Sequence, residues 1–310
     1  MKVSIIVSIY NGADILNVTL PPLINQDYPK EKTEIIFVND GSTDATPKLL
    51  EPHKPKKYIT VITHSTNMGR TITRNSGIKK ATGELLLFLD CDIEVKTDFI
   101  SQHVNYHQNK NVIGVVSHIC TTDVNSKDKF YRYIFFGKRG APLIGENKPL
   151  PFKYFIMGCS SIKSSAVTKT GYFNENLKGY GIDLEYANRL EKNYRGRLFY
   201  SEKIKVIMHK VKILDEVLSD YHQYGQLNVP IILKESPRLA PFVGADFIKS
   251  LNGNITLKII LGTIFINPPI FQLVKLILYI TPFPLSNILI RYLLAASVAM
   301  GYRKYLKKIN

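Results

Sequence analysis

Short apolar runs alternate with helical stretches over about the first 120 residues of the chain. The runs are rich in β-branched residues and are bounded by Gly, Asn, Asp or Pro, as strands that lead into turns are. The strands expected from this pattern are residues 3–9, 34–38, 58–63, 84–89 and 112–119. Because helices fit between them, the alternation predicts a parallel sheet covered by helices.

The run at residues 85–89 is apolar at every position, without the period-two alternation of a half-buried strand. Such a strand is typical of the middle of a sheet that is buried on both faces. We therefore expect a Rossmann-like half, with ligands beyond the carboxyl ends of its strands. Residues 121–210 are less regular and are expected to form a mixed α+β segment that completes the domain and carries the acceptor side.

Three strongly apolar runs follow residue 250, at residues 255–266, 270–280 and 285–300. Each is shorter than the ~20 residues that span a bilayer. Their polar residues keep helical spacing, as Gln272 and Lys275 do, which predicts helices that lie in a membrane interface. The basic residues at the C-terminus would then meet anionic headgroups. Re-entrant or hairpin insertion and a buried helical subdomain are the alternatives that this pattern leaves open.

Composition fits a folded protein with an anionic partner. Hydrophobic residues make up 45% of the 310 residues and charged residues 21%, which argues against wholesale disorder. The net charge of +16 favours nucleic acid, phosphorylated ligands or acidic lipid without choosing among them. The three cysteines lack the spacing of a zinc site or a disulfide framework, so a reducing compartment is expected. The first apolar run is too short for a signal peptide and is expected to be a strand.

Two acids, Asp90 and Asp92, directly follow the apolar strand that ends at Leu89. Unpaired carboxylates at the end of a core strand are unfavourable unless a cation or hydrogen-bond donors receive them. Mg²⁺ and Mn²⁺ prefer oxygen ligands and commonly share them with substrate phosphates. The pattern therefore predicts a divalent metal ion that holds a diphosphate, and a surface turn with two solvated acids is the alternative.

Asp40 occupies a similar position, after an apolar strand and before a helix that is expected to begin near Thr43. Its carboxylate could accept hydrogen bonds from a nucleobase or a ribose, or it could cap the helix. Ser42 or Asp44 could cap the helix equally well, so both interpretations stay open.

Several motifs in chain order resemble those of the family 2 glycosyltransferases, from about residue 2 to about residue 225. They are residues 4–11, residues 38–42, residues 67–69 with Arg74-Asn75, residues 81–84 before Asp90-Cys91-Asp92, and residues 181–190. The resemblance rests on their order and spacing together. It implies an α/β fold of the GT-A type, Rossmann-like with a mixed, mainly parallel sheet and helices on both faces, to which the pattern adds a C-terminal apolar helical extension. The expected boundaries are 1–225 for the catalytic domain, 226–254 for a linker and 255–310 for the membrane-associating extension.

The same resemblance implies roles for individual residues. Asp183 would be the general base of an inverting transfer, and Asp92 would bind the metal directly. His209 stands where many relatives supply a metal ligand, although a lone histidine after an apolar strand is often structural. The residues that would bind the nucleotide sugar are Ser8, Tyr10, Asp40, Gly69, Arg74 and Asp90. Those that would lie near the donor sugar or the acceptor are Arg139, Gly158, Tyr180 and Glu185.

Two departures from the family pattern refine the expectation. Ile182 stands where the family usually has Glu, next to the retained Asp183, which affects acceptor recognition or base strength. The chain has no Trp, so the Gln-x-x-Arg-Trp element of processive polysaccharide synthases is missing. A single-transfer enzyme is therefore favoured over a polymerase.

The sequence thus predicts an inverting glycosyltransferase of the hexosyltransferase type. It would transfer a sugar from a nucleotide sugar, UDP-sugars first, to a saccharide or lipid-linked saccharide acceptor in cell-surface glycan synthesis. It would use Mn²⁺ or Mg²⁺ and work at the cytoplasmic face of the cell membrane, bound to an anionic surface. A polyprenyl-phosphate sugar transferase is the main alternative, and a nucleotidyltransferase or a nucleic-acid-binding module is less favoured. Nucleic acid is not an expected partner, because Asp90, Asp92 and Asp183 would repel a phosphate backbone.

Overall fold

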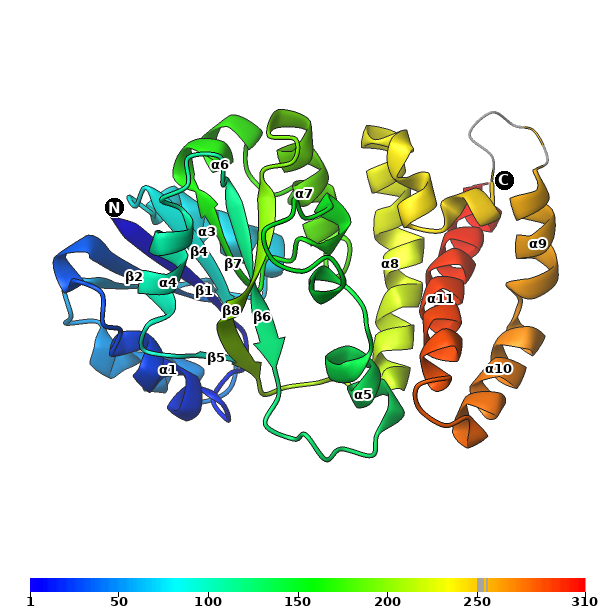
Figure 1. Cartoon of the computed structure of the whole chain (residues 1–310), viewed down its shortest axis with the longest axis horizontal. Helices are drawn as coiled ribbons and strands as arrows, with labels where there is room; N and C mark the ends of the chain where they lie inside the picture. Colours follow the sequence, from blue (N-terminus) through cyan, green and yellow to red (C-terminus); the bar gives the residue numbers. More distant parts are fainter. Residues whose placement is uncertain (250–253, 255, 310) are drawn as a thin grey trace. The chain divides into compact units, whose positions relative to one another are not determined.

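The structure is a computed structural model that describes residues 1–249, 254 and 256–309 (Figure 1). Ile255 and Asn310, the two ends of the predicted extension, lie outside the described residues, as do residues 250–253 of the predicted linker. The chain divides into two compact units. The first comprises Met1–Val124, Arg139–Glu175 and Ile182–Lys210. The second comprises Asn125–Lys138, Asn176–Gly181 and Val211–Asn310.

The first unit is built on one eight-stranded sheet. Its strands are β1 (Val3–Ile9), β2 (Thr33–Asn39), β3 (Ile59–Thr63), β4 (Leu85–Asp90), β5 (Ile93–Val95), β6 (Gly114–Cys120), β7 (Cys159–Lys163) and β8 (Leu198–Met208). They are ordered β3-β2-β1-β4-β7-β6-β8-β5. The first four in this order are parallel, as are β6 and β8, whereas β7 is antiparallel to β4 and β6, and β5 is antiparallel to β8.

Helices cover both faces of this sheet. They are α1 (Leu16–Ile24), α2 (Thr46–Leu50), α3 (Arg70–Lys80), α4 (Phe99–Tyr106), α6 (Ser164–Thr170) and α7 (Ile182–Asn193), with 3-10 turns at Lys30–Lys32, Glu51–His53, Ala141–Leu143 and Phe152–Tyr154. Successive side chains of a strand point to opposite faces, and consecutive residues of β1 and β4 are buried. α3 packs on β1 and β2, and α4 packs on β8.

The predicted α/β architecture is confirmed. All five predicted strands are present, and the largest shift is at the start of β6, which begins at Gly114 instead of residue 112. The sequence pattern did not resolve β7, because its inward positions include the polar residues Ser160 and Ser161. Ser161 is fully buried, and its hydroxyl is hydrogen-bonded to the rings of His103 and His107 at 2.8 Å each. A buried strand with satisfied polar groups carries no apolar signature.

The second unit is helical. Its helices are α5 (Lys129–Phe136), α8 (Leu214–Glu235), α9 (Leu257–Phe265), α10 (Pro268–Ile280) and α11 (Ser286–Ile309), with 3-10 turns at Pro237–Phe242 and Ala245–Phe247. α8 and α11 lie side by side (Figure 1). Their approach depends on glycine: a Cβ at Gly225 would lie 1.9 Å from the carbonyl oxygen of Val298, and one at Gly301 would lie 2.0 Å from that of His222.

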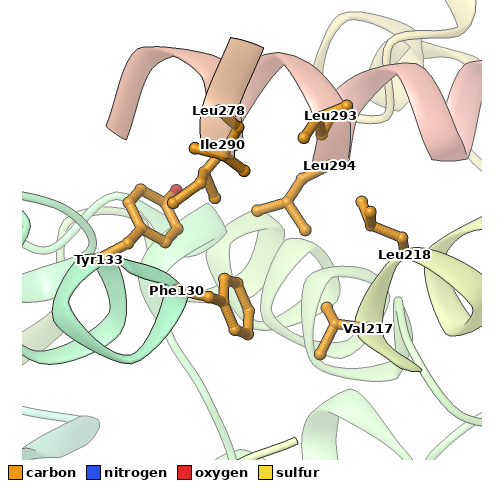
Figure 2. Packing of buried hydrophobic residues seen from close by; sticks show 8 residues of the cluster. All are labelled: Phe130, Tyr133, Val217, Leu218, Leu278, Ile290, Leu293 and Leu294. Carbon is orange, nitrogen blue, oxygen red and sulfur yellow. The ribbon is translucent and has the colours of Figure 1, made fainter. Parts of the chain in front are cut away.

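Four helices of the second unit share a hydrophobic core (Figure 2). α5, α8, α10 and α11 contribute Phe130, Tyr133, Val217, Leu218, Leu278, Ile290, Leu293 and Leu294. α8 is therefore part of the same core as α11. Accordingly, residue 225, the predicted end of the catalytic domain, lies inside α8, and the second unit begins earlier in the chain than the predicted extension.

In the described part of the chain, the helices α9, α10 and α11 coincide with the three C-terminal apolar runs, as predicted. Among the described residues, no single helix combines the length and hydropathy of a membrane span. α9 and α10 meet those criteria only as a pair, with a bend of 66° between them.

Candidate active site

β1 and β4 end side by side at the edge of the sheet where Asp90 lies. The register pairs Ser8 with Asp90, so two predicted nucleotide-sugar residues come together. The backbone N–H of Asp90 donates to the carbonyl oxygen of Gly158 at 2.9 Å, which brings the start of β7 to the same edge. A Cβ at residue 158 would lie 2.6 Å from Oδ2 of Asp90. Gly158 is therefore required for the backbone to approach this carboxylate so closely.

Arg74, on α3, joins two of the predicted acids. Its guanidinium donates to Oδ1 of Asp183 from Nη1 at 2.9 Å and to Oδ1 of Asp90 from Nη2 at 3.3 Å. Only 1% of Arg74 is exposed, and a buried guanidinium is unfavourable unless it is paired. Phe173 adds a cation–π contact, with its ring centroid 5.7 Å from the guanidinium carbon. Arg74 thus holds the end of β4 and the start of α7 in fixed positions.

Asp183 lies in the first turn of α7, where the helix dipole favours a negative charge. Besides the bond from Arg74, its Oδ2 accepts a hydrogen bond from the backbone N–H of Met157 at 3.1 Å. A carboxylate offers about four lone-pair positions, so acceptor capacity remains. The side chain is 32% exposed, unlike that of Arg74, so a hydroxyl group from solution can reach it. This combination of fixed orientation and access suits a general base.

The two carboxyl groups at the end of β4, those of Asp90 and Asp92, differ in how well positive charges compensate them. Burial would raise the pKa of Asp90, but the positive charges of Arg70 and Arg74 outweigh it and hold that pKa below the usual range. Burial, together with the charge of Asp90, raises the pKa of Asp92 to about 6. Asp92 therefore lacks sufficient compensation within the protein, and a bound cation would supply it.

The donor set fits a divalent metal ion that is completed by its substrate. Mg²⁺ is usually held by one or two carboxylates and by substrate phosphates, and Asp90 and Asp92 offer such carboxylates. Within the described part of the chain, no group of three or more His, Cys, Asp or Glu side chains is arranged to hold a metal. The remaining ligands would therefore come from the diphosphate and water.

His209 follows β8, next to the predicted metal ligand. Its backbone N–H donates to the carbonyl oxygen of Asp92 at 3.0 Å, as a consequence of the pairing of β8 with β5. Its ring Nε2 lies 2.6 Å from Oε2 of Glu94. The imidazole thus has a carboxylate partner, and its role as a metal ligand stays a prediction.

Asp40 does not cap α2. That helix begins at Thr46, whose backbone N–H bonds to Oδ1 of Asp44. The buried carboxylate of Asp40 instead accepts hydrogen bonds from the segment that leads into α3. The donors are the backbone N–H groups of Met68 and Gly69 at 2.9 Å each and Nδ1 of His64 at 2.8 Å. Asp40 therefore fixes this segment, and its direct contact with a nucleobase stays a prediction.

Three other predicted residues differ in accessibility. Tyr10, directly after β1, is 48% exposed. Gly69 precedes α3 with a φ of 91°, and a Cβ there would meet nothing within 4 Å. Glu185, in contrast, is buried and forms two hydrogen bonds with Arg189, at 2.6 and 3.0 Å. The carboxylate of Glu185 is engaged within the protein, which argues for a structural role.

The last two predicted residues lie in different units. Arg139 is half-buried and begins the second segment of the first unit. Tyr180 belongs to the second unit, where its ring meets that of Tyr221 edge-on at 4.8 Å between centroids. Tyr180 stands three positions before Asp183 in the sequence, and its place near the donor sugar or the acceptor stays a prediction.

Three further groups shape the site through contacts that were not predicted from the sequence. His64 bonds to Asp40, Arg70 acts electrostatically on both Asp90 and Asp92, and the backbone N–H of Met157 bonds to Asp183. Arg70 could have been noticed as a cation at the start of a helix that follows a glycine. No sequence pattern marks a backbone N–H group.

A family model described as "Glycosyl transferase family 2" matches residues 4–171 of the chain. This range contains Asp40, Arg74, Asp90 and Asp92, and it ends before Asp183.

Several relatives with curated descriptions match a shorter part of the chain. The chain is similar to poly(ribitol-phosphate) beta-glucosyltransferase of Bacillus spizizenii, with 39% identity over 109 residues, which cover 34% of this chain and 17% of that protein. It is also similar to poly(ribitol-phosphate) beta-N-acetylglucosaminyltransferase TarS of Staphylococcus aureus, with 35% identity over 111 residues, which cover 33% of this chain and 19% of that one. The matched part thus spans less than a fifth of each relative's own length.

Several solved structures match the whole chain. The crystal structure of S. aureus TarS 1-349 gives a TM-score of 0.60 at 20% identity and covers 100% of this chain and 91% of that one. The mannosyltransferase PcManGT from Pyrobaculum calidifontis, in complex with GDP-Man and Mn²⁺, gives a TM-score of 0.63 at 18% identity and covers 100% and 88%. At these identities the similarity shows a shared fold.

Proposed function

Because the chain belongs to glycosyl transferase family 2 and has the GT-A fold, we propose that it transfers a sugar from a nucleotide sugar to a saccharide or lipid-linked saccharide acceptor. Two relatives are described as glycosyltransferases of poly(ribitol-phosphate), which supports an acceptor of the cell-wall polymer type. UDP-sugars are the favoured donors, since S. aureus TarS has been solved with UDP and with UDP-GlcNAc.

One observation carries this proposal: a single buried guanidinium, that of Arg74, bonds to both Asp90 and Asp183. Asp90 lies where a sheet of this type receives a nucleotide, at the carboxyl ends of parallel strands. Asp183 is the partly exposed carboxylate beside it. The donor side and the acceptor side of a transfer reaction therefore share one rigid connection.

In the proposed mechanism Asp183 accepts the proton of the acceptor hydroxyl as that oxygen attacks C1 of the donor sugar. The new bond to C1 forms while the bond between C1 and the diphosphate oxygen breaks, so the nucleoside diphosphate leaves from the opposite face and the anomeric configuration inverts. A positioned carboxylate of this kind contributes about 10²- to 10⁴-fold to the rate. Arg74 and the N–H of Met157 orient it.

The donor would lie against the edge formed by Ser8 and Asp90, with the segment held by Asp40 beside the nucleoside. Asp90 and Asp92 would hold a divalent metal ion together with the diphosphate. Such an ion would neutralise the charge that develops on the leaving diphosphate.

The test compares two variants of the full chain, supplied with Mn²⁺, UDP-sugars and an oligosaccharide acceptor. Asp183→Asn is expected to reduce transfer by about 10²- to 10⁴-fold while donor binding is retained. Asp92→Ala is expected to abolish both donor hydrolysis and transfer. Glu51→Gln, which changes an exposed carboxylate paired with Lys54, serves as the control and is expected to leave both unchanged.

The released product separates this function from its rivals. A glycosyltransferase releases a nucleoside diphosphate, whereas a nucleotidyltransferase releases pyrophosphate. NMR of the product reports the anomeric configuration. Full transfer by a folded Asp183→Asn variant would show that this carboxylate is not the base, and pyrophosphate as the product would overturn the proposed reaction.

A further inference from the structure

α9 and α10 each expose a stripe of large apolar side chains. The exposed residues are Leu257, Ile260, Leu261, Ile264 and Phe265 on α9, and Leu273, Leu276, Ile277 and Ile280 on α10. Their spacing of three and four places each set on one face of its helix. Leu257 and Leu276 are each 70% exposed and Ile280 is 81% exposed, so the stripes are not edges of the core. We call these two sets the apolar stripes.

The opposite side of α10 is apolar as well, and it is packed. Phe271 and Val274 lie against the core of the second unit. Leu278 is part of that core (Figure 2). α10 is thus hydrophobic on two sides, with one side in the core and the other uncovered. A helix that is hydrophobic all round is normally buried. The exposed apolar side of α10 would therefore be stabilised by contact with an apolar partner.

Polar anchors fix the direction in which the stripes point. Arg303 on α11 donates to the carbonyl oxygens of Gly262 at 3.1 Å and Ile266 at 2.5 Å, at the end of α9. Lys129 on α5 donates to those of Leu278 at 2.8 Å and Tyr279 at 2.6 Å, at the end of α10. These cations bond to carbonyl groups in the last turns of the two helices and complement the helix dipole, and the carbonyl oxygen of Gly262 also accepts from the backbone N–H of Ile266. The two helices are therefore held with their apolar stripes outward.

The charged side chains of residues 256–309 are all basic. Residues 256–309 contain no Asp or Glu, and their cations are Lys258, Lys275, Arg291, Arg303, Lys304, Lys307 and Lys308. Lys258 and Lys275 pair with Asp246 and Asp215, which lie outside this range. Lys304, Lys307 and Lys308 are exposed in the last turns of α11. An apolar surface accompanied by such charge is complementary to an anionic partner that also offers an apolar layer.

From these observations we propose that the apolar stripes of α9 and α10 dock into the surface of an anionic lipid bilayer, with both helices in the plane of the interface. α9 has nine residues and α10 has thirteen, and a bend of 66° separates them, which suits two interfacial segments better than one span. A second copy of the chain fits less well, because its corresponding segment would bring the same positive charges and no acid to pair with them. This docking does not depend on the proposed transfer reaction.

The absence of Trp from the chain permits a direct test. Leu276→Trp introduces a single indole on the stripe of α10, and Leu227→Trp introduces one at a 57% exposed position of α8, in the same unit. Titration of the full-length variants with vesicles of phosphatidylcholine and phosphatidylglycerol is expected to shift the Leu276→Trp emission to shorter wavelength. The Leu227→Trp emission is expected to stay unchanged. An unshifted Leu276→Trp emission would overturn the proposal.

Vesicle co-sedimentation measures the two contributions separately. Leu276→Glu with Ile280→Glu is expected to weaken binding by at least tenfold, whereas Leu227→Glu is expected to have no effect. Replacing Lys304, Lys307 and Lys308 with Gln is expected to weaken binding by about fivefold per charge and to reduce its sensitivity to salt. Equal binding to purely neutral vesicles, or unchanged binding by a folded Leu276→Glu, Ile280→Glu variant, would contradict the proposal.

Sedimentation velocity without lipid tests whether a second copy of the chain covers the apolar stripes instead. The unaltered chain and the Leu276→Glu, Ile280→Glu variant are expected to have the same oligomeric state. An oligomer that this variant disperses would make a second copy the partner of the stripes and would overturn lipid docking. Transfer activity toward a soluble acceptor should persist in the same variant, so failure of docking and failure of the proposed reaction are distinguishable.

Discussion

Nη1 of Arg74 lies 2.9 Å from Oδ1 of Asp183, although 109 positions separate the two residues in the sequence. The same guanidinium bonds to Asp90, so the proposed base and the acid at the end of β4 are linked through one side chain. Because Arg74 is buried, this link supports both the fold of the first unit and the geometry of the site. Removal of these contacts of Arg74 should therefore lower both the free energy of unfolding and the transfer activity.

Removal of Arg74 is expected to be strongly destabilising. Arg74→Met leaves Asp90 and Asp183 without their shared cation, and breaking a buried ion pair costs about 3–5 kcal/mol. Urea unfolding followed by circular dichroism measures the loss. The double variant Arg74→Met, Asp183→Asn should lose less than the sum of the single losses, by about 0.5–3 kcal/mol. Strict additivity would mean that the two residues are not coupled.

Gly158→Ala is expected to impair the donor site. The added Cβ would lie 2.6 Å from Oδ2 of Asp90, so the carboxylate or the start of β7 must move. Overpacking of this kind costs about 1–3 kcal/mol of stability. Isothermal titration with UDP should show affinity reduced by at least tenfold. Ser160→Ala, at a fully buried position of the same strand, is the control and should retain UDP affinity; equal affinities in both variants would argue against contact of Asp90 with the donor.

Stability is expected to fall in acid because of two buried histidines. Burial lowers the pKa of His103 and of His107 from 6.5 to about 3 each, so the unfolded state binds protons that the folded state does not. The free energy of unfolding is unaffected by these two groups above about pH 6.5. It falls as the pH decreases from about 6.5 to about 3, because the unfolded state then binds the protons. Each group contributes about 1.4 kcal/mol per pH unit in that window.

His103→Gln should therefore reduce the pH dependence of unfolding between pH 6 and 4 by about half of the histidine contribution. Denaturant unfolding at several pH values measures it. The variant also loses hydrogen bonds to Ser117 and Ser161, so its stability at pH 7.5 is compared separately. An unchanged slope would mean that His103 titrates normally in the folded state.

His209→Ala tests whether the histidine is a metal ligand or only a hydrogen-bond partner of Glu94. If the imidazole binds the metal, the Mn²⁺ concentration for half-maximal transfer should rise by at least about tenfold. Glu94→Gln, which removes the charge of its carboxylate partner, should change that concentration less. Activity measured over a Mn²⁺ series gives both values. A stability loss in His209→Ala with an unchanged Mn²⁺ requirement would mark the histidine as structural.

Local patterns were sufficient for the strands at the centre of the sheet. A strand that is covered on both faces must be apolar at consecutive positions, so residues 85–89 identified β4 directly. The same logic placed Asp90 and Asp92 at a strand end. The apolar pattern did not reveal β7. There the buried Ser161 is hydrogen-bonded to His103 and His107, which belong to a distant part of the sequence, so the strand contains polar residues that a local pattern does not explain.

The sequence by itself determined which residues carry charge at the ends of strands and which C-terminal runs are apolar, because both follow from neighbours along the chain. Only the tertiary structure decided that Arg74 reaches Asp183, since strand order and helix packing bring together groups that no local spacing relates. It also decided which apolar side of α10 is packed and which is exposed. Periodicity describes the faces of a helix, whereas the choice between them depends on the helices against which it folds.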